Sequence, residues 1–538
     1  MGKYLGYIAF LLSISFYACG PEHGDGITKN QIFAYNEAAG ITSLDPAFSR
    51  TFENLWAVNQ VFEGLVELDD DLNIVPLIAT HWDVSENGKT YTFYLRNDVF
   101  FHETADFKKR KVTANDFVYS FNRIVNPATA SPGKWVFNKV AENGFSSPDD
   151  QTLVIRLKDA FPPFLGILTM KYCSVVPERA VLKYGDEFRS NPVGTGPFVF
   201  HYWEENQMLV FLKNPHYYLT DGQGKTLPYL DAVSVTFKKD LNAVFLAFLK
   251  GKYDILQGTE GEYVTELLDR AGYLRPMYED NFVLDKSPWL KTDYLGFLID
   301  REKQENNPFL DVRVRKAINL AINRKLLTRV LLHNLGSPAV GGFLPEGMPG
   351  HQSAHENYAF NQGKAARLIV AAGYDLDNQL KIELNTTAAN ANMAQFIQHQ
   401  LSQVGIELKV NILEAGNLNE YVANSNVLFF KKSWLADYPD EENFMALFYS
   451  GNFCPNGPNY THFNNKEFDK LYEKALLVND HNQRVDYYRS MDSTIAAHVP
   501  VVPLYYGQAV KFLQKNIQGL PSNAINTLDL RRVRKGLN

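Results

Sequence analysis

The pattern of hydrophobic and polar positions in this 538-residue chain changes repeatedly between the period of a strand and that of a helix. Helical spacing with one apolar face runs from Val314 to Leu326 and from Met393 to Val404. Strand-like alternation occurs at 91–96, 233–237, 381–384 and 407–412. Strands and helices that alternate in this way predict a mixed α/β protein whose sheets are covered by helices.

Two segments have the order strand, helix, strand. Residues 378–413 read as a strand, a long helix, Gly405 and a second strand, which predicts a βαβ unit with parallel strands. A similar unit is expected around 241–256, where a helix ends at Gly251 before a short strand. No repeat of fixed period is visible in the sequence.

The first residues of the chain have a different character. Lys3 precedes an apolar run at 7–16 that is too short to span a bilayer but typical of a signal peptide. A small residue before Cys19 and polar sequence after it resemble a bacterial lipobox. We therefore expect a signal peptide at 1–18, a lipid on Cys19 and a linker at 19–27, which makes the protein periplasmic and membrane-anchored. The alternative is a plain secretory signal with an incidental cysteine.

Length, charge and cysteine content narrow the class of protein. The chain is too long for one core, so two or three subdomains are expected. Its net charge of -7, without long blocks of one sign, argues against a nucleic-acid partner. Apart from Cys19, only Cys173 and Cys454 are present, and we expect both to be unpaired thiols because a large core needs no disulfides.

The sequence carries no motif of nucleophilic or metal catalysis. It lacks a Gly-x-Ser-x-Gly elbow, a His-Glu-x-x-His helix, a phosphate loop and a Cys-x-x-Cys pair. Residues 194–198 lack the third glycine and the following helix of a dinucleotide site, and predict a tight turn that leads into a strand. We therefore expect no catalytic residue, no metal and no cofactor.

One segment points to ligand recognition. An apolar run at 427–430 predicts a strand, and Trp434 and Asp437 follow where this strand gives way to a loop. Such edges are where open α/β domains bind ligands. A carboxylate beside an aromatic wall binds an ammonium group well. The alternative is a structural role, in which Asp437 caps the loop beside a packed Trp434.

Eight short segments follow one another between Ile41 and Gly519. They are Ser43-Leu44-Asp45-Pro46 with 61–65, 86–96 with 100–102, 112–120, 194–198, 312–318, Trp434-Leu435-Ala436-Asp437, 464–469 and 499–504. Together they resemble the family-5 extracellular solute-binding proteins, the group that contains the oligopeptide and dipeptide receptors of ABC importers. The chain departs from the usual family pattern at Asn323, where Asp is common, and at Glu442, where Pro is common.

The resemblance implies a two-lobed periplasmic-binding-protein type II fold of the α/β class, with an additional subdomain on the first lobe. It implies a monomer that closes around its ligand and delivers it to ABC importer permease subunits. The expected parts are lobe I at 28–64, 191–275 and 493–538, the appended subdomain at 65–190, and lobe II at 276–492.

The resemblance also implies a ligand, a short peptide that lies between the lobes as an added strand. Asp437 is then expected to hold the peptide amino terminus beside Trp434, and Lys431 to meet the carboxylate. Arg50, Thr51 and Phe52 are expected nearest the ligand on the first lobe. The alternatives are a non-peptide solute such as a metal chelate, haem or an oligosaccharide, a periplasmic hydrolase, and a lipoprotein without a permease.

Overall fold

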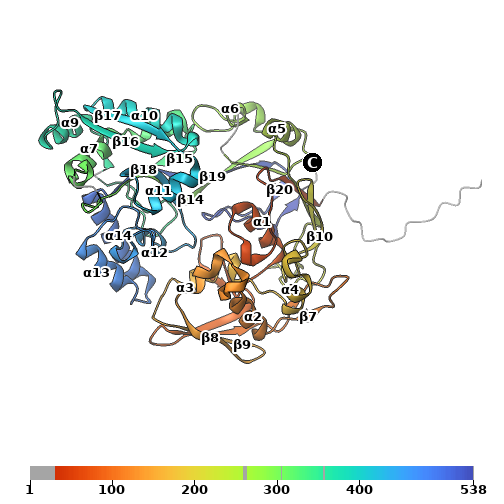
Figure 1. The fold of residues 1–538 in the computed structure, drawn as a ribbon. Coiled ribbons are helices and arrows are strands. Elements are labelled where there is room, and N and C mark those ends of the chain that lie inside the picture. Colours follow the sequence, from red (N-terminus) through yellow and green to blue (C-terminus); the bar gives the residue numbers. More distant parts are fainter. Residues whose placement is uncertain (1–30, 259–262, 304–305, 356–357, 537–538) are drawn as a thin grey trace, which may run out of the picture.

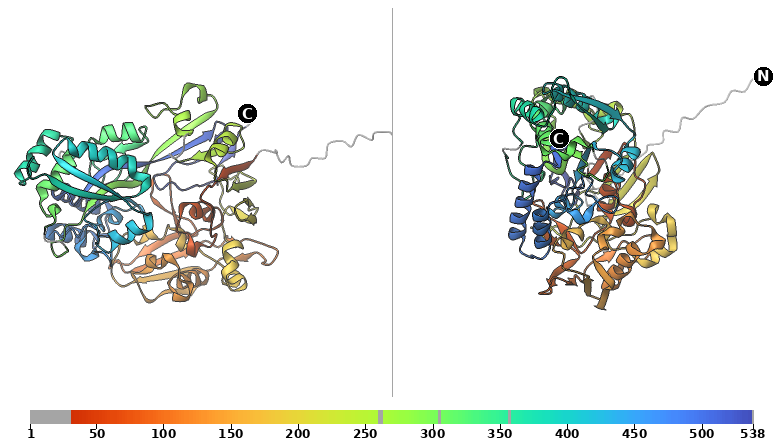
Figure 2. Two further views of the ribbon diagram at one scale, coloured as in Figure 1. Left: turned by 45° about the horizontal axis from the view of Figure 1, so that its top comes forward. Right: turned by 60° about the vertical axis from the view of Figure 1, so that its left-hand side comes forward.

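The computed structural model describes residues 31–258, 263–303, 306–355 and 358–536 (Figure 1). The signal peptide expected at 1–18, the lipid site expected at Cys19 and the linker expected at 19–27 lie outside these residues. Within them, two groups of sheet and helix lie side by side, and an additional antiparallel sheet lies against the first group (Figures 1 and 2).

The first group is built on a four-stranded sheet. Its strands, in spatial order, are β1 (Ile32–Asn36), β12 (Ala232–Thr236), β11 (Met208–Lys213) and β10 (Phe198–Glu204). β1 pairs in parallel with β12, and the other neighbours are antiparallel. Alternate residues of β12, Val233 and Val235, are buried, as the predicted strand requires. Helix α1 (Phe52–Val61) follows β1 and buries Trp56.

The additional sheet is antiparallel throughout. Its order is β4 (Ala79–Val84), β5 (Thr90–Leu95), β9 (Thr152–Leu157) and β8 (Val140–Asp149), and α2 (Ala114–Val125) contacts β8 and β9. Tyr91, Phe93 and Leu95 face one continuous core that also contains Phe33 of the first sheet. An ion pair of 2.6 Å between buried Asp45 and Arg123 of α2 joins the two parts. The additional subdomain is thus attached to the first lobe, as expected, through a hydrophobic core that the two parts share.

The second group is built on a larger sheet, which has seven strands in the described residues. The order is β13 (Ile255–Gln257), β19 (Val501–Gln514), β14 (Phe282–Phe297), β18 (Phe429–Leu435), β16 (Leu380–Thr386) and β17 (Ile406–Ile412), with β15 (Gly336–Pro338) also paired to β19. β16 and β17 are parallel, and α10 (Ala391–Ser402) connects them. The βαβ unit predicted at 378–413 is confirmed.

β14 and β19 run antiparallel and join the two groups. At one end, Phe282 and Phe512 pack in a core with α5 (Leu241–Leu249) and α6 (Tyr263–Leu267). At the other end, Leu295 and Leu504 pack in a core with α7 (Val312–Ala321), α9 (Gln362–Ala371) and α10. The register between the two strands shifts at Pro288–Thr292 and again near Asp293, so the ladder is irregular between its two ends.

The remaining helices surround the larger sheet. They are α8 (Arg324–Leu331), α11 (Ala415–Ala423), α12 (Glu442–Met445), α13 (Lys466–Ala475) and α14 (His481–His498), and the first group also carries α3 (Phe164–Ile167) and α4 (Glu178–Tyr184). No helix in the described part of the chain is both long and apolar enough to cross a membrane. Cys173 and Cys454 are buried free thiols, which confirms the prediction that they do not pair.

Two sequence predictions about local structure are wrong. The unit expected around 241–256 is not a βαβ unit, because β12 and β13 belong to different sheets and β13 pairs antiparallel with β19. The helical stretch from Val314 to Leu326 is divided into α7 and α8. The helix is interrupted at Asn323, because the side chain of this residue accepts a hydrogen bond of 3.0 Å from the Leu326 N–H and so caps the start of α8.

Candidate functional site

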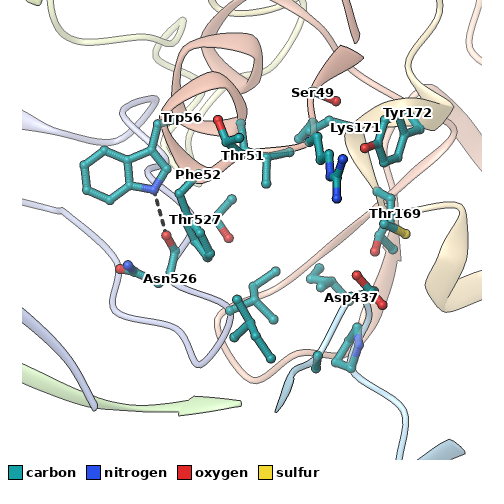
Figure 3. Close-up of a pocket in the computed structure, with 18 of the residues that line it drawn as sticks. Ser49, Thr51, Phe52, Trp56, Thr169, Lys171, Tyr172, Asp437, Asn526 and Thr527 are labelled. Carbon is teal, nitrogen blue, oxygen red and sulfur yellow. Dashed lines mark hydrogen bonds between the residues drawn. The ribbon is translucent and has the colours of Figure 1, made fainter. Parts of the chain in front are cut away.

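A cavity of about 860 Å³ lies where the two groups and the additional sheet meet (Figure 3). The residues that line it are Ser49, Arg50, Thr51, Phe52, Glu53, Leu55, Trp56, Leu68, Pro132, Trp135, Thr169, Met170, Lys171, Tyr172, Leu435, Ala436, Asp437, Pro439, Ile525, Asn526 and Thr527. This size is within the range of pockets that bury small organic ligands.

The wall on the first group comes from the loop before α1. Asp45 caps a short 3-10 helix at Pro46–Phe48 by accepting from the Ala47 N–H at 3.0 Å. The Ser49 hydroxyl donates to the Pro46 carbonyl at 2.8 Å. These bonds, with the Asp45–Arg123 ion pair, fix the loop so that Arg50 is exposed towards the cavity and Thr51 precedes the first turn of α1.

Asp437 enters the cavity from the opposite side. β18 ends at Leu435, and two residues later the Asp437 side chain is exposed in the cavity (Figure 3). Asn443 of α12 holds this residue, because its side-chain oxygen accepts from the Asp437 N–H at 3.2 Å and its amide nitrogen donates to Asp437 Oδ2 at 3.4 Å. Within the described residues, no Lys, Arg or His forms an ion pair with Asp437, so its carboxylate is available to a ligand.

The loop that carries Asp437 also crosses to the other group. Tyr438 is 5% exposed and packs in the core that the first sheet shares with the additional sheet. Its hydroxyl donates to Glu442 of α12. Asp437 therefore lies at the point where the two groups are in contact.

The electrostatics of the cavity follow from its enclosure. Desolvation in the cleft raises the pKa of Asp437, and the hydrogen bond from Asn443 opposes this rise. Burial also raises the pKa of Tyr172, while Arg50 lowers it and Asp437 raises it. Tyr172 is thus close to both charges, and Arg50 and Asp437 lie around one part of the cavity.

The charges of the lining are balanced in sign. Arg50 and Lys171 are the cationic residues of the lining, and Glu53 and Asp437 are the anionic ones. Burial lowers the pKa of Lys171, and the charge of Glu67 opposes this decrease. Two charges of each sign in a partly apolar cavity suit a ligand that carries both an ammonium group and a carboxylate.

The structure brings Arg50, Thr51, Phe52 and Asp437 together around this cavity, but it does not bring Trp434 or Lys431 there. Lys431 is buried and pairs with Asp293 of β14, so the expectation that it meets a ligand carboxylate does not fit this geometry. The adjacent ion pair of Lys291 with Asp293, at 3.1 Å, completes a buried charge cluster.

Trp434 lies behind the site rather than in its wall. Its indole nitrogen donates to Asn443 Oδ1 at 2.9 Å, and its ring packs against a core of the second group. The aromatic residues that line the cavity are instead Phe52, Trp56, Trp135 and Tyr172. No local sequence pattern pointed to Trp135 or Tyr172, since both come from segments far from Asp437 in the chain.

The polar groups of the lining are of several kinds. It contains hydroxyl groups at Ser49, Thr51, Thr169, Tyr172 and Thr527, together with the carboxylates of Glu53 and Asp437. Trp56 donates from its indole nitrogen to the Asn526 carbonyl at 2.8 Å, which ties α1 to the C-terminal segment (Figure 3). The site offers charges, hydrogen bonds and aromatic surface.

A two-lobed α/β fold with one such cavity between its parts defines an extracellular solute-binding protein. Residues 73–453 match the family described as bacterial extracellular solute-binding proteins, family 5, and the chain belongs to this family. Over 483 residues it is 26% identical to di/tripeptide-binding protein 2 of Pseudomonas aeruginosa (strain UCBPP-PA14), covering 86% of each chain. It is 28% identical over 490 residues to the glutathione-binding protein GsiB of Salmonella choleraesuis (strain SC-B67), covering 89% of this chain and 90% of that one.

Solved structures agree with the fold. The DppA periplasmic binding protein from Helicobacter pylori, in complex with the peptide STSA, matches with a TM-score of 0.75 and 26% identity, covering 94% of this chain and 98% of that one. The unliganded open form of the murein tripeptide binding protein MppA matches with a TM-score of 0.78 and 24% identity, covering 94% and 97%. The α/β fold class and the binding-protein architecture expected from the sequence are confirmed.

Proposed function

We propose that this protein captures short peptides in the cavity between its lobes and delivers them to the permease of an ABC importer. The observation that carries the proposal is the position of Asp437. Its carboxylate lines the cavity and is held by Asn443, and it has no ion-pair partner in the described residues. A carboxylate in such a setting binds an ammonium group by a charge-assisted hydrogen bond.

Three further features support a peptide. The second cationic and anionic residues of the lining, Lys171 and Glu53, match the zwitterionic character of a peptide. The aromatic surface accepts side chains without demanding one sequence. The relatives named above include a di/tripeptide-binding protein and a DppA structure that holds a peptide.

The finer parts of the proposal concern anchoring and organisation. We propose a lipid on Cys19, a monomer in solution, and lobes divided at the boundaries given above. The separate cores at the two ends of the β14–β19 ladder support this division. No chemistry on the ligand is part of the proposal, and the ligand leaves the protein unchanged.

Native mass spectrometry of the purified protein tests this function. The expected result is an increase in mass of the native protein that disappears on denaturation. The ligand that is released is expected to give the fragmentation pattern of short peptides. Addition of a mixture of dipeptides and tripeptides to ligand-depleted protein is expected to restore the bound mass. Restoration by a sugar or a metal chelate, with no uptake from the peptide mixture, would exclude peptide capture.

A further inference from the structure

A second group of reactive side chains lies in the second lobe, outside the lining of the cavity. Cys454 is 4% exposed, and its Sγ lies 3.4 Å from Nε2 of His462. Nδ1 of the same imidazole lies 2.7 Å from Asp300 Oδ2. The Ser425 hydroxyl lies 3.2 Å from the sulfur. Thiol, imidazole and carboxylate are thus aligned in the order that activates a cysteine nucleophile.

The contacts of His462 determine which proton state fits. Asp300 Oδ2 faces Nδ1, and the oxygen of an ionised carboxylate accepts hydrogen bonds but cannot donate one. The backbone carbonyl of Cys454, 3.2 Å from Nε2, can only accept as well. Nε2 also lies 3.2 Å from the Ser425 hydroxyl, which can donate or accept. The imidazolium form donates to Asp300 from Nδ1 and to the Cys454 carbonyl from Nε2. The Cys454 thiol, 3.4 Å from Nε2, is the more acidic of the two neighbours that could supply the additional proton.

The opposite case occurs at His102, which shows what a buried neutral histidine looks like in this protein. Its Nε2 lies 2.9 Å from the Gly196 carbonyl, while its Nδ1 accepts from the Gly194 N–H at 3.4 Å. One donor and one acceptor satisfy the neutral ring, and burial lowers its pKa to about 4. The two histidines therefore differ in the hydrogen-bond partners that the chain supplies.

The neighbours of the sulfur act in both directions. The Val422 carbonyl, 3.7 Å away, accepts from the thiol, whereas Ser425 and His462 can donate to the thiolate. Burial alone would raise the pKa of Cys454, but the hydrogen bonds from His462 and Ser425 outweigh it and hold the pKa below its usual value. Phe453 stacks on the His462 ring at a centroid distance of 4.6 Å and fixes its plane. Tyr460 is a further titratable group close to the sulfur, and burial followed by the charge of Cys454 raises its pKa.

The segment that carries the cysteine reaches the protein surface. Pro455 and Asn456, directly after the cysteine, are exposed. Cys173 is different, because it is fully buried in the first core, its thiol donates to the Ile167 carbonyl at 3.5 Å, and burial raises its pKa. The described residues therefore contain one activated thiol and one inert thiol for comparison.

We infer that Cys454, His462 and Asp300 form a reactive thiol site that undergoes exchange with low-molecular-weight disulfides. The Cys454 thiol transfers its proton to His462 Nε2, and the thiolate attacks one sulfur of the small disulfide. A new bond forms between Cys454 Sγ and that sulfur, the old disulfide bond breaks, and the other half leaves as a thiolate that takes up a proton. The product is a mixed disulfide on the second lobe, and the peptide cavity takes no part.

Peptide mapping by mass spectrometry tests the inference on the folded full-length chain. The probe is bis(2-hydroxyethyl) disulfide, which is small and uncharged, and the rate of label uptake is measured at Cys454 and Cys173 across a range of pH. The expected result is labelling of Cys454, with a rate that reaches half its plateau at lower pH than in the urea-unfolded chain. Cys173 is expected to stay unlabelled in the folded protein.

The variants separate activation from mere exposure. His462→Gln is expected to move the half-plateau pH of Cys454 up to or above that of the unfolded chain, and Asp300→Asn to move it part of the way. Peptide binding is expected to be unchanged in both variants. Labelling of Cys454 no faster than Cys173, or an unshifted pH profile in His462→Gln, would overturn the inference. The comparison of the two cysteines needs no substitution and remains decisive if a variant does not fold.

Discussion

Asn443 donates a hydrogen bond from its side-chain amide to the carboxylate of Asp437, at 3.4 Å, from a different element of the second lobe. The same side chain accepts from the Asp437 N–H and from the Trp434 indole, so one buried amide fixes three points of the segment 434–437. The carboxylate that meets the ligand is therefore positioned by α12 rather than by its own loop alone.

Removal of this support is expected to weaken peptide binding. Asn443→Ala leaves Asp437 in place but frees its side chain, and we expect a loss of about tenfold in affinity, the net value of one or two hydrogen bonds. Isothermal titration calorimetry with a tripeptide measures it. Trp434→Phe, which removes only the indole donor, is the matched control and is expected to lose less. Unchanged affinity in Asn443→Ala would show that the loop holds Asp437 without help.

Arg50 is expected to contribute through a ligand carboxylate. It is exposed in the cavity, and its guanidinium forms no ion pair within the described residues. We expect Arg50→Gln to reduce the affinity for a tripeptide by about tenfold, a value typical of a hydrogen bond to a charged group. A C-terminally amidated peptide should lose less. Arg329→Gln, at an exposed position on α8, serves as control. An equal loss for free and amidated peptides would contradict this role.

Peptide affinity is expected to depend on pH through Asp437. Desolvation raises the pKa of this carboxyl in the free protein, so it is ionised and competent above that pKa and takes up a proton as the pH falls below it. The affinity for a peptide with a free ammonium group should therefore be greatest near neutral pH and decrease by up to about tenfold per unit of pH below the pKa. Titration at several pH values measures this, and Asp437→Asn should abolish the dependence.

Stability in acid is expected to depend on His102. Its pKa is lowered from 6.5 to about 4 because the ring is buried and neutral. Above pH 6.5, the pKa of the histidine in the unfolded chain, the stabilising contribution of neutral His102 to the unfolding free energy is fully present. This contribution is lost as the pH falls from 6.5 towards 4, because the unfolded chain binds the proton first. The loss amounts to about 3 kcal/mol of unfolding free energy.

Urea unfolding of wild type and His102→Gln at two pH values measures this contribution. Buried carboxyls such as Glu63 and Asp492, whose pKa is raised to about 7 by burial, act in the opposite sense. The difference between wild type and variant isolates the histidine. If both lose the same free energy between neutral and acid pH, His102 is not the group responsible.

The sequence predicted elements and their order better than their pairing. The period-two run at 381–384 and the helix after it were sufficient for a parallel unit, because a short crossover leaves few alternatives. The run at 255–257 was not sufficient to predict a pairing, since β13 pairs with β19, which lies near the far end of the chain. A local pattern holds no information about a strand as distant in the chain as β19, where Leu513 is the partner of Ile255.

The same limit applies to the site. Asp437 could be found from its position after an apolar strand, and its outward direction follows from the end of β18. Trp434 and Lys431 were expected to touch the ligand. Instead, Trp434 donates a hydrogen bond to Asn443, and Lys431 forms an ion pair with Asp293. Trp135 and Tyr172 reach the cavity only through the packing of the additional sheet, which no local motif encodes.

The central claim is that a ligand ammonium group binds Asp437, and calorimetry with one tripeptide in free and N-acetylated forms tests it most directly. The account predicts that wild type binds the free peptide and loses about 2–5 kcal/mol with the acetylated one, while Asp437→Ala loses binding of the free peptide and keeps its unfolding free energy. Equal affinity of wild type for the free and acetylated peptides would contradict it.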